Sequence, residues 1–143
     1  MSPASAATGY SGKPVWQKLG LAPGARVLVR GAPSDYAGIV GLDTSALTLA
    51  PPRGAFDVAH VFATSAKTLD AEITALAKRL PAAGALWISW PKKAAKVATD
   101  ITEDTVRNIA LPLGLVDVKV CAIDATWSAL KLVWRRDRRD GKS

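Results

Sequence analysis

The stretch that decides the fold is DVAHVFATSAKTLDAEITALAKRLPAAGALWISW, which covers residues 57–90. Residues 57–63 are almost continuously apolar, as is typical of a strand that is covered on both faces. Residues 64–80 have one apolar stripe at helical spacing, made of Leu69, Ile73, Leu76 and Leu80. A second apolar run over residues 85–90 predicts another buried strand. The stretch therefore predicts a strand, a helix and a strand of one parallel sheet.

Four elements are predicted before this stretch: a helix over 14–19, a strand over 26–30, a short helix over 34–40 and a weak strand over 45–50. Residues 51–56, which follow the weak strand, are too few for an ordinary parallel crossover of about a dozen residues. Either the segment 45–50 is not a regular parallel strand, or an element has been lost there.

One more helix is predicted after this stretch, beginning at Asp100 and ending near Ala110. Asp100 and Glu103 resemble a capping box, in which a side chain accepts a hydrogen bond from the first turn of the helix. The helix is expected to end there because Pro112 disfavours helical backbone at Leu111.

An antiparallel hairpin is predicted at the end of the domain, with strands over 115–123 and 128–134 joined by a turn over 124–127. In the first strand, one face is expected to hold Val116, Val118, Val120 and Ala122. In the second strand, one face is expected to hold Leu130, Leu132 and Trp134.

The chain of 143 residues has the size of one domain. The alternation of strands and helices predicts a single-domain α/β fold, with a mainly parallel, doubly wound, Rossmann-like sheet and a C-terminal antiparallel hairpin. We expect the domain to span residues 13–135, after a flexible N-terminal arm over 1–12 and before a basic, disordered tail over 136–143.

The amino-acid composition excludes several classes of protein. Hydrophobic residues make up 49% of the chain and charged residues 22%, which excludes a globally disordered chain. No apolar run approaches the ~20 residues that a membrane span needs, and the first twelve residues lack the pattern of a signal peptide. Cys121 is the single cysteine, so no internal disulfide is possible, and a cytoplasmic location is expected.

The net charge of +7 is spread unevenly. Residues 135–143 contain five basic and two acidic side chains. Such a tail permits nucleic-acid binding through Arg135–Arg139, and the alternative is a solvated tail that keeps the protein soluble. No membrane partner is expected.

Three segments resemble the S-adenosylmethionine-dependent methyltransferases: LGLAPGARVLV at 19–29, FDVAHV at 56–61 and LPAAGAL at 80–86. They are similar to the entry into the first strand of that family, to its fourth strand and to the turn into its fifth. The terminal hairpin is similar to the last two strands. The resemblance implies a truncated methyltransferase-like sheet, in which the strand 128–134 lies antiparallel between the strands 85–90 and 115–123.

Four other segments resemble a family of small bacterial proteins that is known only as a domain of unknown function: GYSGKP at 9–14, SWPKK at 89–93, VATD at 97–100 and GLVDVKVC at 114–121. This resemblance spans nearly the whole chain, but it implies no activity.

Two features of the methyltransferase pattern are missing. The turn after the first strand has one glycine, Gly31, whereas a glycine-rich turn lets the backbone approach a cofactor. No acid, which would hold ribose hydroxyls, follows Leu49. The sequence therefore predicts no cofactor and no catalytic residue.

A binding site is predicted beyond the carboxyl ends of the strands, where open α/β sheets bind ligands. Lys92 and Lys93 follow a strand that should be central, and cations beside the amides of a helix start favour an anion. The predicted binding residues are Trp90, Lys92, Lys93, Thr99, Asp100, Asp124 and Trp127. The alternative is that Asp100 and Asp124 pair with the two lysines in an ordinary solvated loop.

The histidine and the cysteine fit packing roles. His60 lies in an apolar strand without a second histidine to share a metal, so we expect a core histidine with hydrogen-bond partners and no metal site. Cys121 lies on a hairpin strand with no histidine predicted nearby to act as its base, so packing is expected there as well.

Three functions stay open. The first, which we favour, is non-catalytic binding of a small anionic molecule or a protein partner in the crevice. The second is a reduced methyltransferase. The third is nucleic-acid binding through the basic tail together with Trp90 or Trp127.

Overall fold

The computed structural model describes residues 14–21, 24–42, 48–51 and 53–136. Within these ranges the strands are β1 (Arg26–Arg30), β2 (Thr48–Leu49), β3 (Val58–Phe62), β4 (Ala85–Pro91), β5 (Leu115–Ala122) and β6 (Trp127–Trp134). The helices are α2 (Val15–Lys18), α3 (Tyr36–Val40), α4 (Ala66–Ala77) and α5 (Glu103–Leu113), with one 3₁₀ helix, η2 (Lys93–Ala95). The predicted arm, 1–12, and residues 137–143 of the predicted tail lie outside the described residues.

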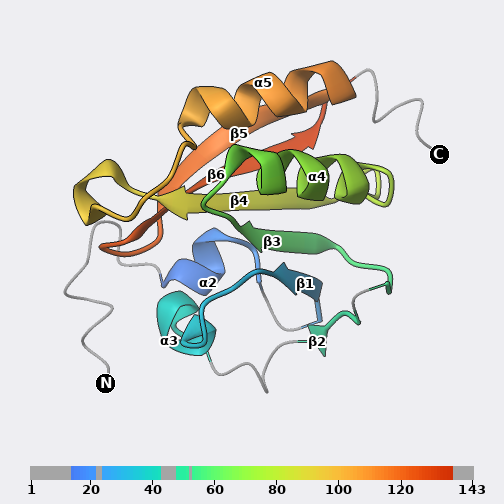
Figure 1. The fold of residues 1–143 in the computed structure, drawn as a ribbon. Coiled ribbons are helices and arrows are strands. Elements are labelled where there is room, and N and C mark those ends of the chain that lie inside the picture. The colour runs from blue at the N-terminus through green and yellow to red at the C-terminus, as the bar shows by residue number, and fades with distance from the viewer. Residues whose placement is uncertain (1–13, 22–23, 43–47, 52, 137–143) are drawn as a thin grey trace.

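The strands form one sheet in the order β2-β1-β3-β4-β6-β5. β1 pairs in parallel with β2 and β3, and β3 pairs in parallel with β4. β6 is antiparallel to both of its neighbours, β4 and β5. The predicted mainly parallel α/β sheet with a C-terminal hairpin is confirmed, and so is the position of the final strand between 85–90 and 115–123 (Figure 1).

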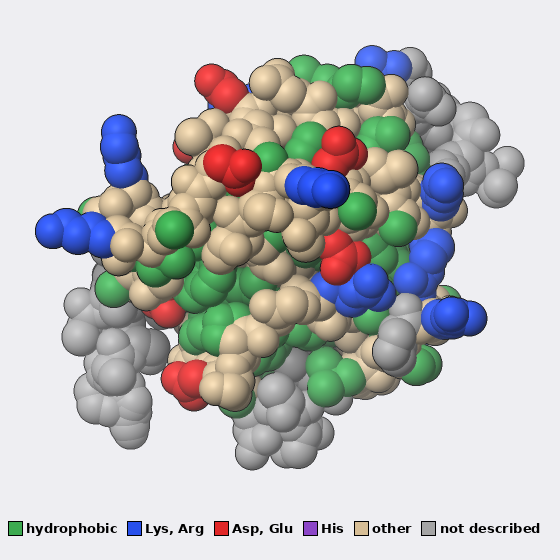
Figure 2. All heavy atoms as spheres, in the orientation of Figure 1, with side chains coloured by type: hydrophobic (Ala, Val, Ile, Leu, Met, Phe, Trp, Pro, Cys, Tyr) green, Lys and Arg blue, Asp and Glu red, His purple; other side chains and the backbone are tan. Residues whose placement is uncertain are grey.

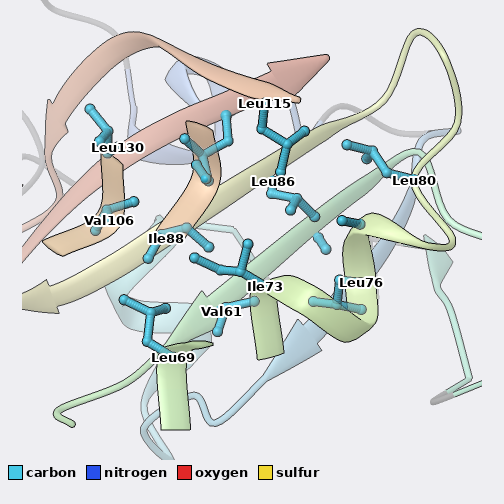
Figure 3. Close-up of a cluster of buried hydrophobic side chains, with 14 of the residues drawn as sticks. Val61, Leu69, Ile73, Leu76, Leu80, Leu86, Ile88, Val106, Leu115 and Leu130 are labelled. Atoms are coloured by element: carbon cyan, nitrogen blue, oxygen red, sulfur yellow. The ribbon is translucent and has the colours of Figure 1, made fainter. Parts of the chain in front are cut away.

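Two cores hold the helices against the two faces of the sheet. On one face, α4 and α5 lie side by side, and the predicted stripe of α4 is buried: Figure 3 shows Leu69, Ile73 and Leu76 among side chains of β3 and β4. On the other face, α2 and α3 pack over β1, β3 and β4. Each fully buried leucine or isoleucine stabilises the fold by roughly 1.5–3 kcal/mol. Because helices cover both faces of the sheet, the doubly wound arrangement is confirmed.

The register of β2 explains the short connection that follows it. Leu49 pairs with Val27, the second residue of β1, so β2 ends near the level at which β1 begins. β3 begins at the same level, because Val58 also pairs with Val27. Asp57, just before β3, accepts hydrogen bonds from the backbone and side chain of Arg26. The chain therefore only has to pass the start of β1, and no full crossover is needed.

The predicted start and end of the last helix were both wrong. Thr102 caps α5, because its hydroxyl accepts from the Thr105 amide while the Thr105 hydroxyl accepts from the Thr102 amide. The helix continues through Pro112, since Leu113 packs on the core and Gly114, with a φ of 94°, closes the last turn. Core packing here outweighs the local effect of proline.

The predicted alternation in the hairpin was wrong for β5. A β-bulge lies between Asp117 and Lys119, so Val118 has no partner in β6. Val116 therefore lies on one face of the sheet, whereas Val120 lies on the other, opposite Leu130. In β6 the expected face of Leu130, Leu132 and Trp134 is confirmed, and all three are buried. No helix in the described part of the chain is long and apolar enough to cross a membrane.

Candidate functional site

A cleft of about 620 Å³ opens beyond the end of β4, between the segment that leaves this strand and the first turns of α5. We call it the β4–α5 cleft. Its lining residues are Trp90, Pro91, Lys92, Lys93, Thr99, Ile101, Thr102, Glu103, Asp104, Arg107 and Ser128. Ligand pockets in proteins usually have volumes of about 300–1,000 Å³, so the cleft is large enough for a small organic molecule.

The floor of the cleft is apolar and fixed. Trp90 and Ile101 are 6% and 3% exposed and belong to the core under α4 and α5. Because both side chains are packed on the core, a ligand would meet a surface that is already formed.

Thr99 and Asp100 tie the loop above the cleft to the start of α4. The Thr99 hydroxyl donates to the Thr64 carbonyl at 2.7 Å and accepts from the Ile101 amide at 3.1 Å. The Asp100 carboxylate accepts from the Ala66 amide at 2.7 Å. Asp100 therefore satisfies an amide in the first turn of α4, and the prediction that it caps the next helix was wrong.

Arg107 is the cation of the α5 wall, and its charge is compensated. Its guanidinium donates to Asp117 at 3.0 Å, to Glu103 at 2.7 Å and to Asp104 at 3.3 Å. Asp117 first, and then Glu103, raise the pKa of Arg107 above its ordinary value. The α5 wall therefore presents carboxylate oxygens as well as a cation, and the spacing of Glu103 and Asp104 before Arg107 is the sequence signal that could have shown this.

Lys92 and Lys93 form the opposite wall. The Lys92 amide donates to the Thr126 carbonyl at 2.7 Å, which fixes the backbone there. Neither lysine side chain forms an ion pair with any described residue. Figure 2 shows Lys and Arg side chains projecting at the left of the view, over the segment between β4 and α5.

Asp124 and Trp127 do not line the cleft. The Asp124 carboxylate accepts from the amides of Thr126 and Trp127, both at 2.8 Å, and so closes the turn between β5 and β6. The Trp127 ring packs edge-on against Phe62, with centroids 5.0 Å apart, on the other face of the sheet. Of the seven predicted binding residues, the structure brings four into the cleft: Trp90, Lys92, Lys93 and Thr99.

His60 is a hydrogen-bonded core histidine, as predicted. It has no exposed surface, and its Nδ1 lies 2.9 Å from the Tyr36 hydroxyl while its Nε2 lies 2.7 Å from the Ser89 hydroxyl. Burial lowers the pKa of His60 to about 3, so the ring is neutral. The sequence did not show these two partners, because they come from α3 and β4. Among the described residues, no group of three or more His, Cys, Asp or Glu side chains could hold a metal ion.

Comparisons with solved structures relate this geometry to known proteins. The magnesium protoporphyrin IX methyltransferase of Synechocystis PCC 6803, crystallised with bound SAM, has a TM-score of 0.56 at 15% identity, and the match covers 81% of this chain and 73% of that one. This chain has a methyltransferase-like fold. The fibrillarin pre-rRNA processing protein of Methanococcus jannaschii has a TM-score of 0.56 at 13% identity, covering 92% and 73% of the two chains.

A tRNA methyltransferase of B. subtilis matches in the same way, with a TM-score of 0.53 at 11% identity and coverage of 89% of this chain and 67% of that one. Such low identities show the fold alone. No family model matches the chain, and no curated protein matches it. The resemblance to a bacterial family of unknown function therefore stays a prediction.

The described residues depart in two respects from the S-adenosylmethionine site expected from the sequence. Gly31 has a φ of 70°, and a Cβ there would lie 2.5 Å from the Phe62 carbonyl oxygen, so contact with β3 already explains this glycine. β2 ends opposite Val27, three residues before β1 ends at Arg30, which is roughly 10 Å short of the carboxyl edge. A ribose-binding acid after β2 would therefore lie too far from the crevice.

Proposed function

We propose that this protein is a non-catalytic binding module that holds a small organic anion in the β4–α5 cleft. The observation that supports it most is the lack of ion-pair partners, among the described residues, for the two lysines on one wall. Lys92 and Lys93 line the cleft without an ion-pair partner among the described residues, while the other cation of the cleft, Arg107, is bound by three carboxylates.

In the alternative interpretation, Asp100 and Asp124 pair with Lys92 and Lys93, but both carboxylates have other partners. Asp100 accepts a hydrogen bond from the Ala66 amide, and Asp124 accepts from amides of its own turn. Neither carboxylate forms an ion pair with Lys92 or Lys93. An anion in the cleft would therefore gain two cationic partners without displacing an internal one, which supports binding of a phosphate or a carboxylate group.

The two walls differ in charge, and this bears on the shape of the ligand. Lys92 and Lys93 favour an anionic group at one end. Glu103 and Asp104 offer acceptor oxygens at the other end, and Trp90 and Ile101 offer apolar surface between them. A ligand of matching chemistry has an anionic group, a short apolar or planar middle and a hydrogen-bond donor at its far end.

A reduced methyltransferase is the second candidate, because structures with this fold bind S-adenosylmethionine, as in the Synechocystis enzyme. The β1 turn and the short β2 argue against it. We expect isothermal titration calorimetry with S-adenosylmethionine to show no binding at micromolar concentration. A micromolar dissociation constant, about −8 kcal/mol, would favour the methyltransferase instead.

The cleft is tested by titrating inorganic phosphate and following backbone amides by NMR. Binding should shift amides of residues 90–104, and the Lys92→Ala/Lys93→Ala variant should weaken it about tenfold or more, since bonds to charged groups contribute about 1.5–3 kcal/mol. The matched control is Lys67→Ala/Lys78→Ala, which removes the same charge from α4 and from the residue that follows it. Shifts confined to the Arg-rich tail, or equal losses in both variants, would overturn the proposal.

A further inference from the structure

The face of the β5–β6 hairpin that is turned away from α5 has two lysines directly opposite each other. In an antiparallel pair, opposite residues project to the same face. Lys119 of β5 is paired with Lys131 of β6, and the next pair on the same face, towards the hairpin turn, is Cys121 with Ala129. The bulge before Lys119 places it here, because without the bulge its side chain would lie on the α5 side.

This lysine pair is unfavourable for folding. Like charges directly opposite on neighbouring strands destabilise a sheet. Neither Lys119 nor Lys131 forms an ion pair with a described residue. On the α5 face of the same strand, in contrast, Asp117 is matched by Arg107 at 3.0 Å. The chain thus compensates charge on one face of the hairpin and leaves it uncompensated on the other.

A third lysine extends this charged surface. Lys18 lies in the last turn of α2, and α2 is followed by Leu19, which packs in the same core as Cys121 and Ala129. The charges of Lys18, Lys119 and Lys92 all act on the Cys121 thiol: burial raises its pKa above the ordinary value, and the three lysines offset part of that rise. Lys18, Lys119 and Lys131 therefore belong to one surface around Cys121.

Two indole rings pack on the same core as Cys121 and Ala129. Trp127 lies on the same face of β6 as Ala129 and Lys131, since the three alternate along the strand. Trp16, in α2, is partly buried against the same core. We define the basic face as Lys18, Lys119 and Lys131 together with Trp16 and Trp127.

We propose that the basic face binds single-stranded nucleic acid. Proteins that bind single strands combine lysines or arginines, which contact phosphates, with aromatic rings on which bases stack. A membrane surface is a poorer match, because it is bound by basic amphipathic helices with bulky apolar side chains, and α2 has only four residues. The basic face shares no residue with the lining of the β4–α5 cleft.

The test uses the full chain and a fluorescein-labelled 20-nucleotide oligouridylate, with binding followed by fluorescence anisotropy. The Lys119→Ala/Lys131→Ala variant should lose about tenfold or more in affinity at 50 mM salt. Its plot of log affinity against log salt should be less steep by about 1.4, or 0.7 for each lost phosphate contact. The matched control, Lys67→Ala/Lys78→Ala, should keep both affinity and slope nearly unchanged.

A second readout separates binding from folding. Because the two lysines repel each other, Lys119→Ala/Lys131→Ala should raise the midpoint of thermal unfolding while it weakens binding. A lowered midpoint with lost binding would mean that the variant is misfolded and that the pair is structural, against the proposal. Single Lys119→Met and Lys131→Met variants, which keep the length of the side chain, should each still lose several-fold in affinity.

Three outcomes would overturn the proposal. The first is no binding of the oligonucleotide by the intact chain at 50 mM salt. The second is loss of binding in an Arg138→Ala/Arg139→Ala variant of the tail but not in Lys119→Ala/Lys131→Ala. The third is binding to vesicles that contain phosphatidylserine without binding to the oligonucleotide.

Discussion

Lowering the pH from 7 to 5 should destabilise this protein through one side chain, His60. The ring is fully buried and hydrogen-bonded to Tyr36 and Ser89, and burial lowers its pKa from about 6.5 to about 3. In the folded state it therefore stays neutral across this range, whereas in the unfolded chain it takes up a proton. The contribution of the neutral His60 ring to the free energy of unfolding is complete above about pH 7. It falls as the pH drops below 6.5, towards the folded pKa near 3.

The size of the effect follows from proton linkage. Each pH unit below the unfolded pKa removes about 1.4 kcal/mol of unfolding free energy, so the loss between pH 7 and pH 5 is about 2 kcal/mol. His60 is the one histidine of the chain, and ordinary carboxylates are still mostly ionised at pH 5. The change is therefore attributable to this ring.

Urea unfolding followed by tryptophan fluorescence measures this change. With a slope of about 2 kcal/mol per molar urea, the midpoint should fall by about 1 M between pH 7 and pH 5. A His60→Leu variant has no ring to titrate, so its midpoint should hardly depend on pH in this range. If the variant is too unstable to fold, the ring protons of His60 in the wild-type protein give the same test by NMR. A ring that titrates near pH 6.5 in the folded protein, or a constant midpoint, would refute the reasoning.

Two further changes probe the same core. Tyr36→Phe should cost about 1–3 kcal/mol of unfolding free energy, because it leaves His60 Nδ1 buried without a partner; a urea midpoint equal to that of the wild type would contradict this. Gly31→Ala should cost clearly more than Gly41→Ala in the same measurement. Both glycines have positive φ, which costs an alanine about 1–2 kcal/mol, but only at Gly31 would the new Cβ meet a backbone atom, the Phe62 carbonyl oxygen at 2.5 Å. If both substitutions lowered the unfolding free energy equally, β3 would have to move to relieve this contact.

The parts of the fold that could be predicted are those whose signal lies within one segment. The stripe of α4 and the apolar run of β4 read directly from residue spacing, because each element buries its side chains along its whole length. β2 could not be predicted in the same way. It has two residues, and its pairing with β1 depends on contacts far along the chain.

The candidate site was predicted in part, for a similar reason. Lys92 and Lys93 could be placed because the order of the strands decides which loops meet at the carboxyl edge. Trp127 could not, because it is the first residue of β6, and its ring packs against Phe62 of the distant strand β3 on the other face of the sheet. Asp100 and Thr102 are both capping residues, and only the tertiary position of the loop decides which helix each one caps.

The bulge at Val118 also affects how the protein meets copies of itself. β5 lies at one edge of the sheet, and a long regular edge strand is a template for aggregation, because its free amides and carbonyls can pair with another chain. The irregularity divides β5 into two short runs whose side chains alternate out of step. A strand from a second molecule could follow one run but would lose its register at the other. We therefore expect the bulge to disfavour an extended intermolecular sheet along the exposed Val118 and Val120.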